Sequence, residues 1–476
     1  MSVPSTTPGP DVAASEAPLA DATISTLVVL GASGDLAYRL LLPALGKLLD
    51  AEPHRRGLVL LGVGAEVWDD RTWKERVETS LRGAQVSGET VDALLGATSY
   101  QQADVTKAVD LQQLIDRAAP APALYFALPP AVTAKACDAL SEVDLPAGTV
   151  LVLEKPFGVD EDSAKALNAR LATLVPEERT FRVDHFLGRS TVLNLLGVRF
   201  ANRIFEPLWN SDHIASVDIV YDEQLTLEGR ARYYDNAGAL VDMIQSHLLQ
   251  VMALVAVAPV AAVSAFDLRE AKAEVLRACR VWGDDPARSS RRARYTSGTV
   301  GGRQVPDYAD EPGVEPSRDT ETLAEVVLEV NNWRWAGVPF RLRSGKSIGA
   351  ARKEVVLTFK PAPHVPTGLA GDVAPNQLRL VLNPDAMALE INVNGQDDPM
   401  AIDHVSLDTD LSPGRLPAYG EVLAGVLDGD PLLAVRGDTA VDCWRIIDPV
   451  LEAWRTGQTP LESYPAGSQG PKDWPT

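Results

Sequence analysis

The chain has 476 residues, 46% hydrophobic and 23% charged, so it can bury a large core and is long enough for two or three domains. Its net charge of −21 argues against binding to nucleic acid or an anionic membrane, because both would be repelled. Three cysteines, Cys137, Cys279 and Cys443, lie far apart without CxxC spacing, so neither a disulfide framework nor a cysteine metal site is indicated, and a reducing cytoplasm fits best.

The first 24 residues are rich in Pro, Ala and Ser and begin MSVPSTTPGP. They lack the basic region and the apolar core of a secretory signal, so we expect a disordered lead. The fold should begin at residue 25.

Residues 25–200 alternate short apolar runs with helical patterns. Runs bounded by turn residues are typical of strands buried on both faces of a parallel sheet. We therefore predict an N-terminal doubly wound, Rossmann-like α/β domain. The four clearest strands are residues 26–30, 58–63, 123–128 and 150–154.

The first predicted strand runs into GASGDLA, residues 31–37, and then into a helical pattern. Glycines at 31 and 34 would let the backbone turn tightly against a pyrophosphate at the helix N-terminus. The motif lacks the middle glycine of GxGxxG, so a purely structural turn stays an alternative. Its place after the first strand favours a dinucleotide site made by Gly31, Ala32, Ser33, Gly34, Asp35 and Leu36.

The segment RVDHFLGR, residues 182–189, places His185 beside Asp184 and near Arg189. With Arg182, Arg199 and Arg203 close in sequence, it predicts a local basic patch suited to a phosphate. A solvated charged face is the alternative.

A second histidine, His247, lies in DMIQSHLLQVMAL, a predicted buried helix. Histidine is the usual proton acceptor for a dehydrogenase, although a hydrogen-bonded core histidine is the competing interpretation. The apolar run at residues 248–263 is interrupted by Gln250 and Pro259 and is too short for a membrane span, so we predict a buried helix.

Residues 201–476 show repeated strands with fewer helices between them, and Asn394-Gly395 indicates a hairpin. We predict a larger α+β domain with a mostly antiparallel sheet. In this region SGKS, residues 344–347, imitates the end of a P-loop, but Phe340 stands where the first glycine should be. We reject a nucleotide kinase and keep Lys346 as a possible anion ligand or a solvated lysine.

Seven segments in order make the chain resemble glucose-6-phosphate dehydrogenases over residues 26–456. They are GASGDLA, EKPFG, RVDHFLGR, NLLGVRFANRIFEPLWN, EGRARYYDNAGALVDMIQSHLLQ, VPFRLRSGK and LPAYGEVLAGVLDGD with the downstream CWRIIDPVLEAW. The resemblance implies oxidation of C1 of glucose 6-phosphate to the lactone, the first step of the oxidative pentose phosphate pathway. It also implies NADP or NAD as cofactor, no metal, and a homodimer or homotetramer built through the large sheet.

The resemblance also implies roles for individual residues. His247 matches the general base and Asp184 the carboxylate that holds it. Lys155 matches a lysine between substrate and cofactor, followed by Pro156 after a cis bond. The phosphate ligands would be His185, Arg189 and Lys346, and the sugar hydroxyl ligands Glu223 and Asp242.

Three departures concern the substrate: Phe186 replaces a usual tyrosine, Arg189 a usual lysine, and Leu40 a common lysine. They leave open another sugar phosphate, an unphosphorylated aldose, or a catalytically silent regulatory paralogue. Retention of His247, Asp184 and Lys155 argues against the silent paralogue, which has no chemical need for them.

A fourth departure concerns the cofactor, since Ala65 stands where NADP-using relatives generally carry arginine. Glu66 follows and could accept hydrogen bonds from the ribose hydroxyls of NAD. Ser33 could donate to the 2′-phosphate of NADP, and Arg39 or Arg71 could fold over the adenosine. We therefore predict that both cofactors are accepted.

Overall fold

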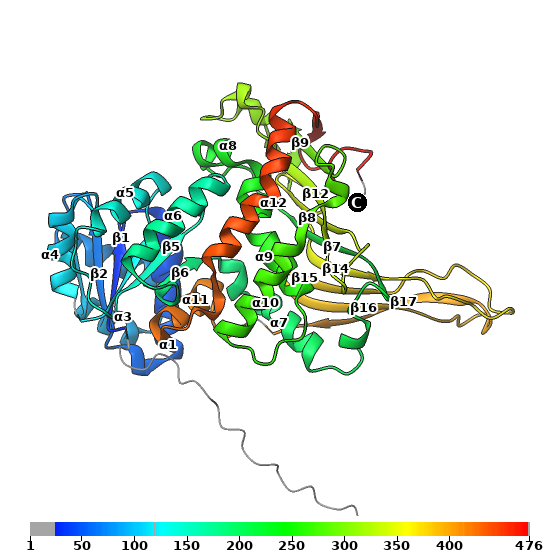
Figure 1. The fold of residues 1–476 in the computed structure, drawn as a ribbon, viewed down its shortest axis with the longest axis horizontal. Helices are drawn as coiled ribbons and strands as arrows, with labels where there is room; N and C mark the ends of the chain where they lie inside the picture. The colour runs from blue at the N-terminus through cyan, green and yellow to red at the C-terminus, as the bar shows by residue number, and fades with distance from the viewer. Residues whose placement is uncertain (1–23, 119, 413, 475–476) are drawn as a thin grey trace, which may run out of the picture.

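The computed structural model describes residues 24–118, 120–412 and 414–474. The predicted disordered lead lies outside these residues except for Ile24. Two sheets with helices packed around them make up the fold, and helices α9, α10 and α12 lie between the sheets (Figure 1).

The first sheet is seven-stranded, and its strands run parallel except for the antiparallel β18 at one edge. Every residue of β1 is buried, which fits a strand covered on both faces. The predicted Rossmann-like sheet is therefore confirmed. In spatial order its strands are β18 (Ala434–Val435), β6 (Thr180–Val183), β5 (Val150–Glu154), β4 (Pro122–Phe126), β1 (Thr26–Leu30), β2 (Val59–Gly64) and β3 (Thr98–Gln102).

Helices cover both faces of this sheet. The first begins as a π-helix, η1, and continues as α1. Asp69 caps α2 by accepting a hydrogen bond from the backbone N–H of Thr72 at 2.8 Å. The helices are η1 (Ala37–Leu41), α1 (Leu42–Ala51), α2 (Asp70–Gly83), α3 (Gly88–Gly96), α4 (Ala108–Ala118), α5 (Pro130–Leu140) and α6 (Glu161–Leu174).

The second sheet is ten-stranded and mostly antiparallel, as predicted; only β13 with β7 and β19 with β9 pair in parallel among its described strands. Its strands are β17 (Ile402–Asp410), β16 (Asp385–Asn394), β15 (Gln377–Leu382), β14 (Lys353–Phe359), β7 (Ile214–Asp222), β13 (Phe340–Gly345), β12 (Leu323–Val330), β9 (Ser290–Thr296), β19 (Leu461–Pro465) and β8 (Cys279–Val281). A separate pair joins β10 (Gly298–Val300) to β11 (Arg303–Val305).

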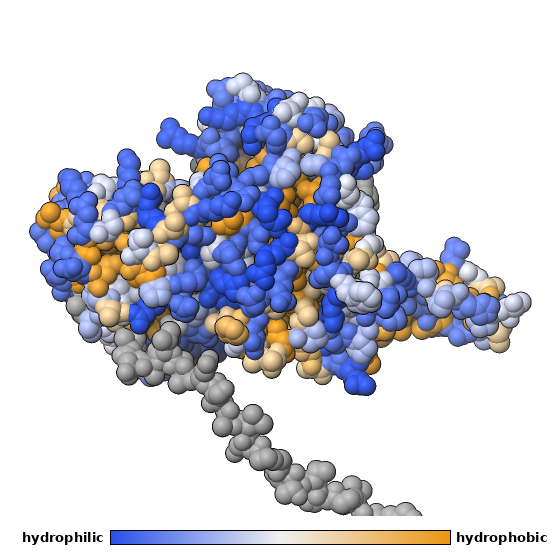
Figure 2. Space-filling model, viewed as in Figure 1, coloured by the Kyte–Doolittle hydropathy of each residue, from blue (hydrophilic) through white to orange (hydrophobic). Residues whose placement is uncertain are grey.

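The last two strands of this sheet, β16 and β17, form an arm that projects away from the rest of the chain (Figure 1). The predicted hairpin is confirmed, but its turn is longer than a tight Asn-Gly turn, because Asn394 pairs with Ile402 and residues 395–401 connect the strands. Hydrophobic patches interrupt the hydrophilic surface of the arm (Figure 2). Val393, Met400 and Leu407 are its exposed large hydrophobic residues.

The helices of the second half pack between the sheets and beside them. They are α7 (Ser190–Phe200), α8 (Ala231–Ala239), η6 (Leu240–Leu248), α9 (Leu249–Ala256), α10 (Ala265–Ala278), α11 (Ala418–Asp428) and α12 (Gly437–Arg455). The stretch Ala231–Ala256 is long and apolar enough to cross a membrane by composition alone, but 89% of its apolar window is buried in this fold. The buried-helix prediction is confirmed for residues 248–256 and was wrong for residues 257–263, which leave the helix and include the exposed Val263.

The chain returns to the first sheet near its C-terminal end. Leu423 and Val426 of α11 pack in the same buried cluster as Leu45 and Leu48 of α1. Immediately afterwards β18 pairs with β6. The C-terminal part of the chain thus supplies one helix and one edge strand to the first sheet.

Candidate active site

A π-helix, η6, presents two of the candidate residues, Asp242 and His247, to the same buried region. The helix starts after Gly238, whose φ of 66° favours glycine. A Cβ at this position would also lie 2.3 Å from Glu321 Oε1. Glu321 Oε1 accepts a hydrogen bond from the backbone N–H of Leu240 at 2.9 Å, so it caps the start of the helix.

Asp184 and His247 come from opposite halves of the chain and meet as a buried pair, with His247 Nδ1 2.5 Å from Asp184 Oδ1. Asp184 Oδ1 also accepts a hydrogen bond from the backbone N–H of Phe186 at 3.0 Å, which fixes the carboxylate. A carboxylate only accepts, so the proton of neutral His247 lies on Nδ1 and leaves Nε2 as a base. The pairing implied by the resemblance is present.

Burial lowers the pKa of His247 because the imidazolium is poorly solvated, and the charge of Asp184 partly offsets this effect. Asp184 is buried too, which would raise its pKa, but the neighbouring His247 holds the pKa of the carboxyl well below its usual range. At neutral pH the pair is therefore a carboxylate and a neutral imidazole, the state that a general base requires.

This electrostatic balance predicts a pH effect. Activity should fall as pH drops through the pKa of His247, on a limb below pH 6.5, the ordinary histidine value. Asp184→Asn removes the charge that raises the pKa of His247, so the limb should move to lower pH. The pH dependence of kcat for wild type and Asp184→Asn with the same substrate measures the shift. A limb that moves to higher pH in Asp184→Asn would contradict the conclusion that the charge of Asp184 raises the pKa of His247.

His185 stacks on Tyr419 at 5.3 Å and meets His247 edge-on at 4.6 Å between ring centroids. Nearby lies a half-buried acid, Glu154, which accepts a hydrogen bond from Tyr125 Oη at 2.5 Å. Burial raises the pKa of Glu154 to about 7. Sequence reasoning missed Glu154, Tyr125 and Tyr419, although Glu154 directly precedes Lys155 in the EKPFG motif.

Lys155 Nζ donates to the backbone carbonyl of Asp242 and lies 3.3 Å from its Oδ1. Tyr233 Oη donates to the same oxygen at 3.2 Å. Burial would raise the pKa of Asp242, but Lys155 and Lys346 lower it to about 2. The structure thus brings Lys155 and Asp242 together, and the Lys155–Pro156 bond is cis, as the resemblance implies.

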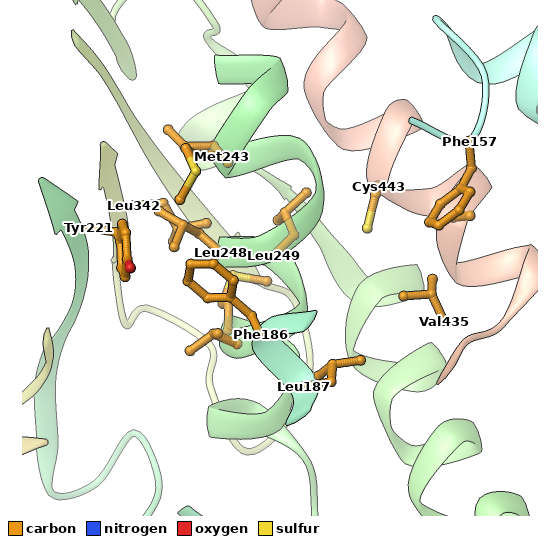
Figure 3. Close-up of a cluster of buried hydrophobic side chains, with 14 of the residues drawn as sticks. Phe157, Phe186, Leu187, Tyr221, Met243, Leu248, Leu249, Leu342, Val435 and Cys443 are labelled. Atoms are coloured by element: carbon orange, nitrogen blue, oxygen red, sulfur yellow. The ribbon is translucent and has the colours of Figure 1, made fainter. Parts of the chain in front are cut away.

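Arg189 reaches across to the second sheet, where its Nη2 donates to Tyr221 Oη at 3.0 Å. Its guanidinium lies 4.8 Å above the ring of Phe186. That ring stacks on His247 at 4.3 Å, so Phe186 supports the base by packing. Figure 3 shows Phe186 between Tyr221 and Leu248.

Lys346 follows the end of β13, and its Nζ lies 2.8 Å from Glu223 Oε2. Glu223 follows β7, the strand parallel to β13, so the two strand ends place the pair side by side. Both side chains are partly exposed, as ligands for a polar substrate must be.

Two arginines of the predicted basic patch do not join it. Arg182 is buried and binds Glu177, with its Nη1 2.9 Å from Oε1. Arg199 is buried as well and binds Glu206 and three backbone carbonyls. Burying a guanidinium requires such partners, so both arginines are structural and the patch prediction was wrong for them. Arg203 is exposed and does not contact the candidate ligands named here.

The glycine turn sits between β1 and η1, as predicted. Gly31 has φ of 87°, and a Cβ there would lie 2.3 Å from the carbonyl oxygen of Ala127, so only glycine fits. The N–H groups of Gly31 and Ala32 donate to the carbonyl of Val63 at 2.8 and 2.9 Å. This compact strand-turn-helix unit fits a dinucleotide.

At the adjoining end of β2, Gly64 lies close to three polar groups, of which Tyr100 Oη is the nearest, 2.7 Å from a Cβ placed on the glycine. A Cβ on Gly64 would be 2.8 Å from Glu66 Oε2 and 3.5 Å from Ser33 Oγ. Glu66 therefore faces the glycine turn beside Ser33, where a carboxylate can accept from ribose hydroxyls.

The arginines proposed to cover the adenosine are exposed, and Arg39 lies beside Asp35 of the glycine turn. Arg39 and Arg71 point into solvent, each near an acid one helical turn away: Arg39 Nε is 3.8 Å from Asp35, and Arg71 Nε is 3.6 Å from Glu75. A different residue, Arg76 of α2, reaches the turn and donates to the carbonyl of Ser33 at 2.7 Å.

The Arg76 guanidinium lies 4.5 Å above the ring of Tyr38 and 5.5 Å from that of Trp68. These contacts hold it beside the turn. Leu40, at the position of a common active-site lysine, is 44% exposed on η1 and offers no charge.

Asp184, His185 and His247 carry ligand atoms within 4.8 Å of one another, a spacing that could also suit a metal ion. Asp184 Oδ1 and His247 Nδ1 are bonded to each other, an arrangement that suits a carboxylate and the base it orients. The absence of a metal requirement stays a prediction.

A dinucleotide-type turn combined with a carboxylate-held histidine defines a nicotinamide-dependent dehydrogenase, in which a base must take a proton as hydride leaves. Two family models match the chain: "Glucose-6-phosphate dehydrogenase, NAD binding domain" over residues 28–194 and "Glucose-6-phosphate dehydrogenase, C-terminal domain" over residues 196–475. The chain belongs to the glucose-6-phosphate dehydrogenase family.

Known members of this family align with the chain over nearly the full length of both proteins. The glucose-6-phosphate 1-dehydrogenases of Zymomonas mobilis and Mycolicibacterium smegmatis are each 36% identical, over 94% of this chain and 96% and 94% of theirs. The crystal structure of the Mycobacterium avium enzyme matches with a TM-score of 0.83 at 32% identity, covering 94% of this chain and 95% of that one. The structure of a glucose-6-phosphate dehydrogenase in complex with glucose 6-phosphate matches with a TM-score of 0.84 at 28% sequence identity. The match covers 94% of this chain and 96% of that one.

Proposed function

We propose that this protein is a glucose-6-phosphate dehydrogenase that oxidises C1 of glucose 6-phosphate to the 1,5-lactone with NADP or NAD. The observation that carries the proposal is the buried His247–Asp184 pair beside Lys155 and Asp242, where residues that follow β6 and β5 of the first sheet meet η6. Relatives with this activity match over nearly their whole length.

In the mechanism, Nε2 of His247 takes the proton of the C1 hydroxyl, and Asp184 stabilises the imidazolium that forms. A nicotinamide dinucleotide held at the glycine turn would supply the acceptor for the hydride that leaves C1. Asp242 and Glu223 accept hydrogen bonds from sugar hydroxyls, while Lys155 neutralises Asp242 and orients it. His185, Arg189 and Lys346 bind the phosphate. Gly31 to Leu36, with Glu66, hold the dinucleotide.

The decisive experiment is an absorbance assay of nicotinamide reduction with glucose 6-phosphate, glucose and other sugar phosphates, each with NADP and with NAD. The proposal requires glucose 6-phosphate to give the highest kcat/KM. A higher kcat/KM for another sugar would support the alternative that Phe186 and Leu40 leave open, a dehydrogenase for a different sugar or sugar phosphate. No turnover with any sugar would support a catalytically silent paralogue.

For the cofactor, we propose that both NADP and NAD are used. Glu66 beside Ser33 suits the ribose hydroxyls of NAD, whereas Arg76, held over the carbonyl of Ser33, is a cation close enough to the turn to offset the repulsion between Glu66 and a 2′-phosphate. No arginine is needed at position 65 for this compensation.

The cofactor proposal predicts a ratio of kcat/KM for NADP to NAD that stays within ~100-fold, equivalent to about 2.7 kcal/mol. Ala65→Arg combined with Glu66→Ser should raise the ratio, because it adds a phosphate partner and removes a negative charge. Calorimetric binding of both cofactors to the two proteins provides a readout besides turnover, with Arg71→Ala as the control. A wild-type preference beyond ~100-fold in either direction would refute dual use.

We also propose a homodimer or homotetramer formed through the large sheet and working in the cytoplasm on the oxidative pentose phosphate pathway. The exposed apolar residues Val393, Met400 and Leu407 on the projecting arm support such an interface. The three buried free cysteines support a reducing compartment. Light scattering in solution would measure the oligomeric state.

A further inference from the structure

Phe186 leaves the proposed phosphate site without a side-chain hydroxyl at that position, and the structure offers another one nearby. Tyr221 lies on β7, and its ring meets the edge of Phe186 at 4.9 Å between centroids (Figure 3). Tyr221 and Glu223 are two residues apart along an extended segment, so they point to the same side. Tyr221 therefore lies next to the strand end that carries the Glu223–Lys346 pair.

The Tyr221 hydroxyl is held in place but keeps a free proton. It accepts a hydrogen bond from Arg189 Nη2 at 3.0 Å, and it donates to no partner within the described part of the chain. A phenol that accepts from an arginine can still donate once. Burial raises the pKa of Tyr221, so the hydroxyl stays protonated at neutral pH.

Charged side chains of both signs surround Tyr221: besides burial, the carboxylate of Glu223 is close enough to raise the pKa of the phenol, and two cations lie over its ring. Arg189 lies 5.5 Å from the centre of the Tyr221 ring, and Lys353 Nζ lies 4.9 Å from it, across the β14–β7 pairing. A neutral donor bonded to a guanidinium suits an anionic oxygen ligand, because the arginine and the hydroxyl can bind the same oxygen-rich group together.

We propose that Tyr221 is a substrate-binding residue that donates a hydrogen bond to the phosphate of the sugar phosphate, supplying the hydroxyl that Phe186 lacks. This inference rests on the proposed function. In this proposal Arg189 and Tyr221 act together: the guanidinium orients the phenol, and both side chains bind the same phosphate.

The test compares wild type with Tyr221→Phe, which keeps the ring and removes only the hydroxyl. Calorimetric titration with glucose 6-phosphate and with inorganic phosphate should show Kd raised by about tenfold for both, as expected for a hydrogen bond to a charged group. The KM for glucose should stay the same. Tyr308→Phe, which removes a buried hydroxyl bonded to Asp235 instead, is the matched control and should change none of these values.

Unchanged Kd values for both phosphates in Tyr221→Phe would overturn the inference. So would a Kd raised for glucose 6-phosphate alone, because the hydroxyl would then contact the sugar. An equal loss with glucose and glucose 6-phosphate would make Tyr221 structural and overturn it as well. If instead wild type fails to oxidise glucose 6-phosphate with either cofactor, the proposed function itself is refuted.

Discussion

Replacing His247 with asparagine should lower kcat by at least ~10²-fold, the low end for general base catalysis, while KM for glucose 6-phosphate changes little. The reason is chemical, since an amide cannot take a proton at neutral pH. Asparagine can still donate a hydrogen bond to Asp184, so the buried carboxylate keeps a partner and the fold is preserved. Steady-state kinetics give both parameters, and thermal unfolding verifies the fold.

The control is His404→Asn, because His404 is an exposed histidine on the projecting strand β17 and lies in no part of the proposed site. It should leave kcat at the wild-type value. Asp184→Asn should show a smaller loss than His247→Asn in the same parameter. Near-normal turnover by His247→Asn would remove this residue from the mechanism.

Replacing Arg189 with alanine should raise KM for glucose 6-phosphate by about tenfold or more, because a charge-assisted hydrogen bond contributes roughly 1.5 to 3 kcal/mol. The loss combines the direct phosphate contact with the orientation of Tyr221. Activity with glucose should hardly change, since glucose has no phosphate to bind. Initial rates with both substrates, over a range of concentrations, measure the difference.

Arg288→Ala is a matched control, because this arginine is 90% exposed and far along the chain, with its Nε 3.6 Å from Asp285. It should alter neither KM. If Arg189→Ala raises KM equally for glucose and for glucose 6-phosphate, the role of Arg189 is to pack over Phe186. That result would support an unphosphorylated sugar as the substrate.

Strands with continuous apolar sequences were predictable, and two polar strands were not. The run TLVVL at residues 26–30 coincides with β1, because burial on both faces demands apolar residues throughout. The edge strand β3, TSYQQ, buries only alternate residues and was missed. The strand β6, TFRV, contains Arg182, whose charge suggested a surface although Glu177 and Asn168 satisfy it inside.

The site shows a similar division. No spacing rule joins Asp184 to His247, since one follows the last parallel strand of the first sheet and the other lies on a helix packed on the second; only the family resemblance paired them. Arg76 escaped notice because α2 folds back over the glycine turn, a contact that sequence distance hides. The sequence gives no sign that Tyr221 differs from any other strand residue. Only its hydrogen bond with Arg189 in the structure points to a role in binding the phosphate.

The return of the chain to its first sheet has a consequence for folding. A fragment that stopped near residue 200 would lose β18, which covers the edge of β6, and α11, whose Leu423 and Val426 pack with the side chains of α1. An open strand edge beside uncovered leucines favours aggregation over a stable half. The two sheets should therefore melt as one cooperative unit, and a cut in the segment that joins them should not release an independently folding cofactor-binding piece.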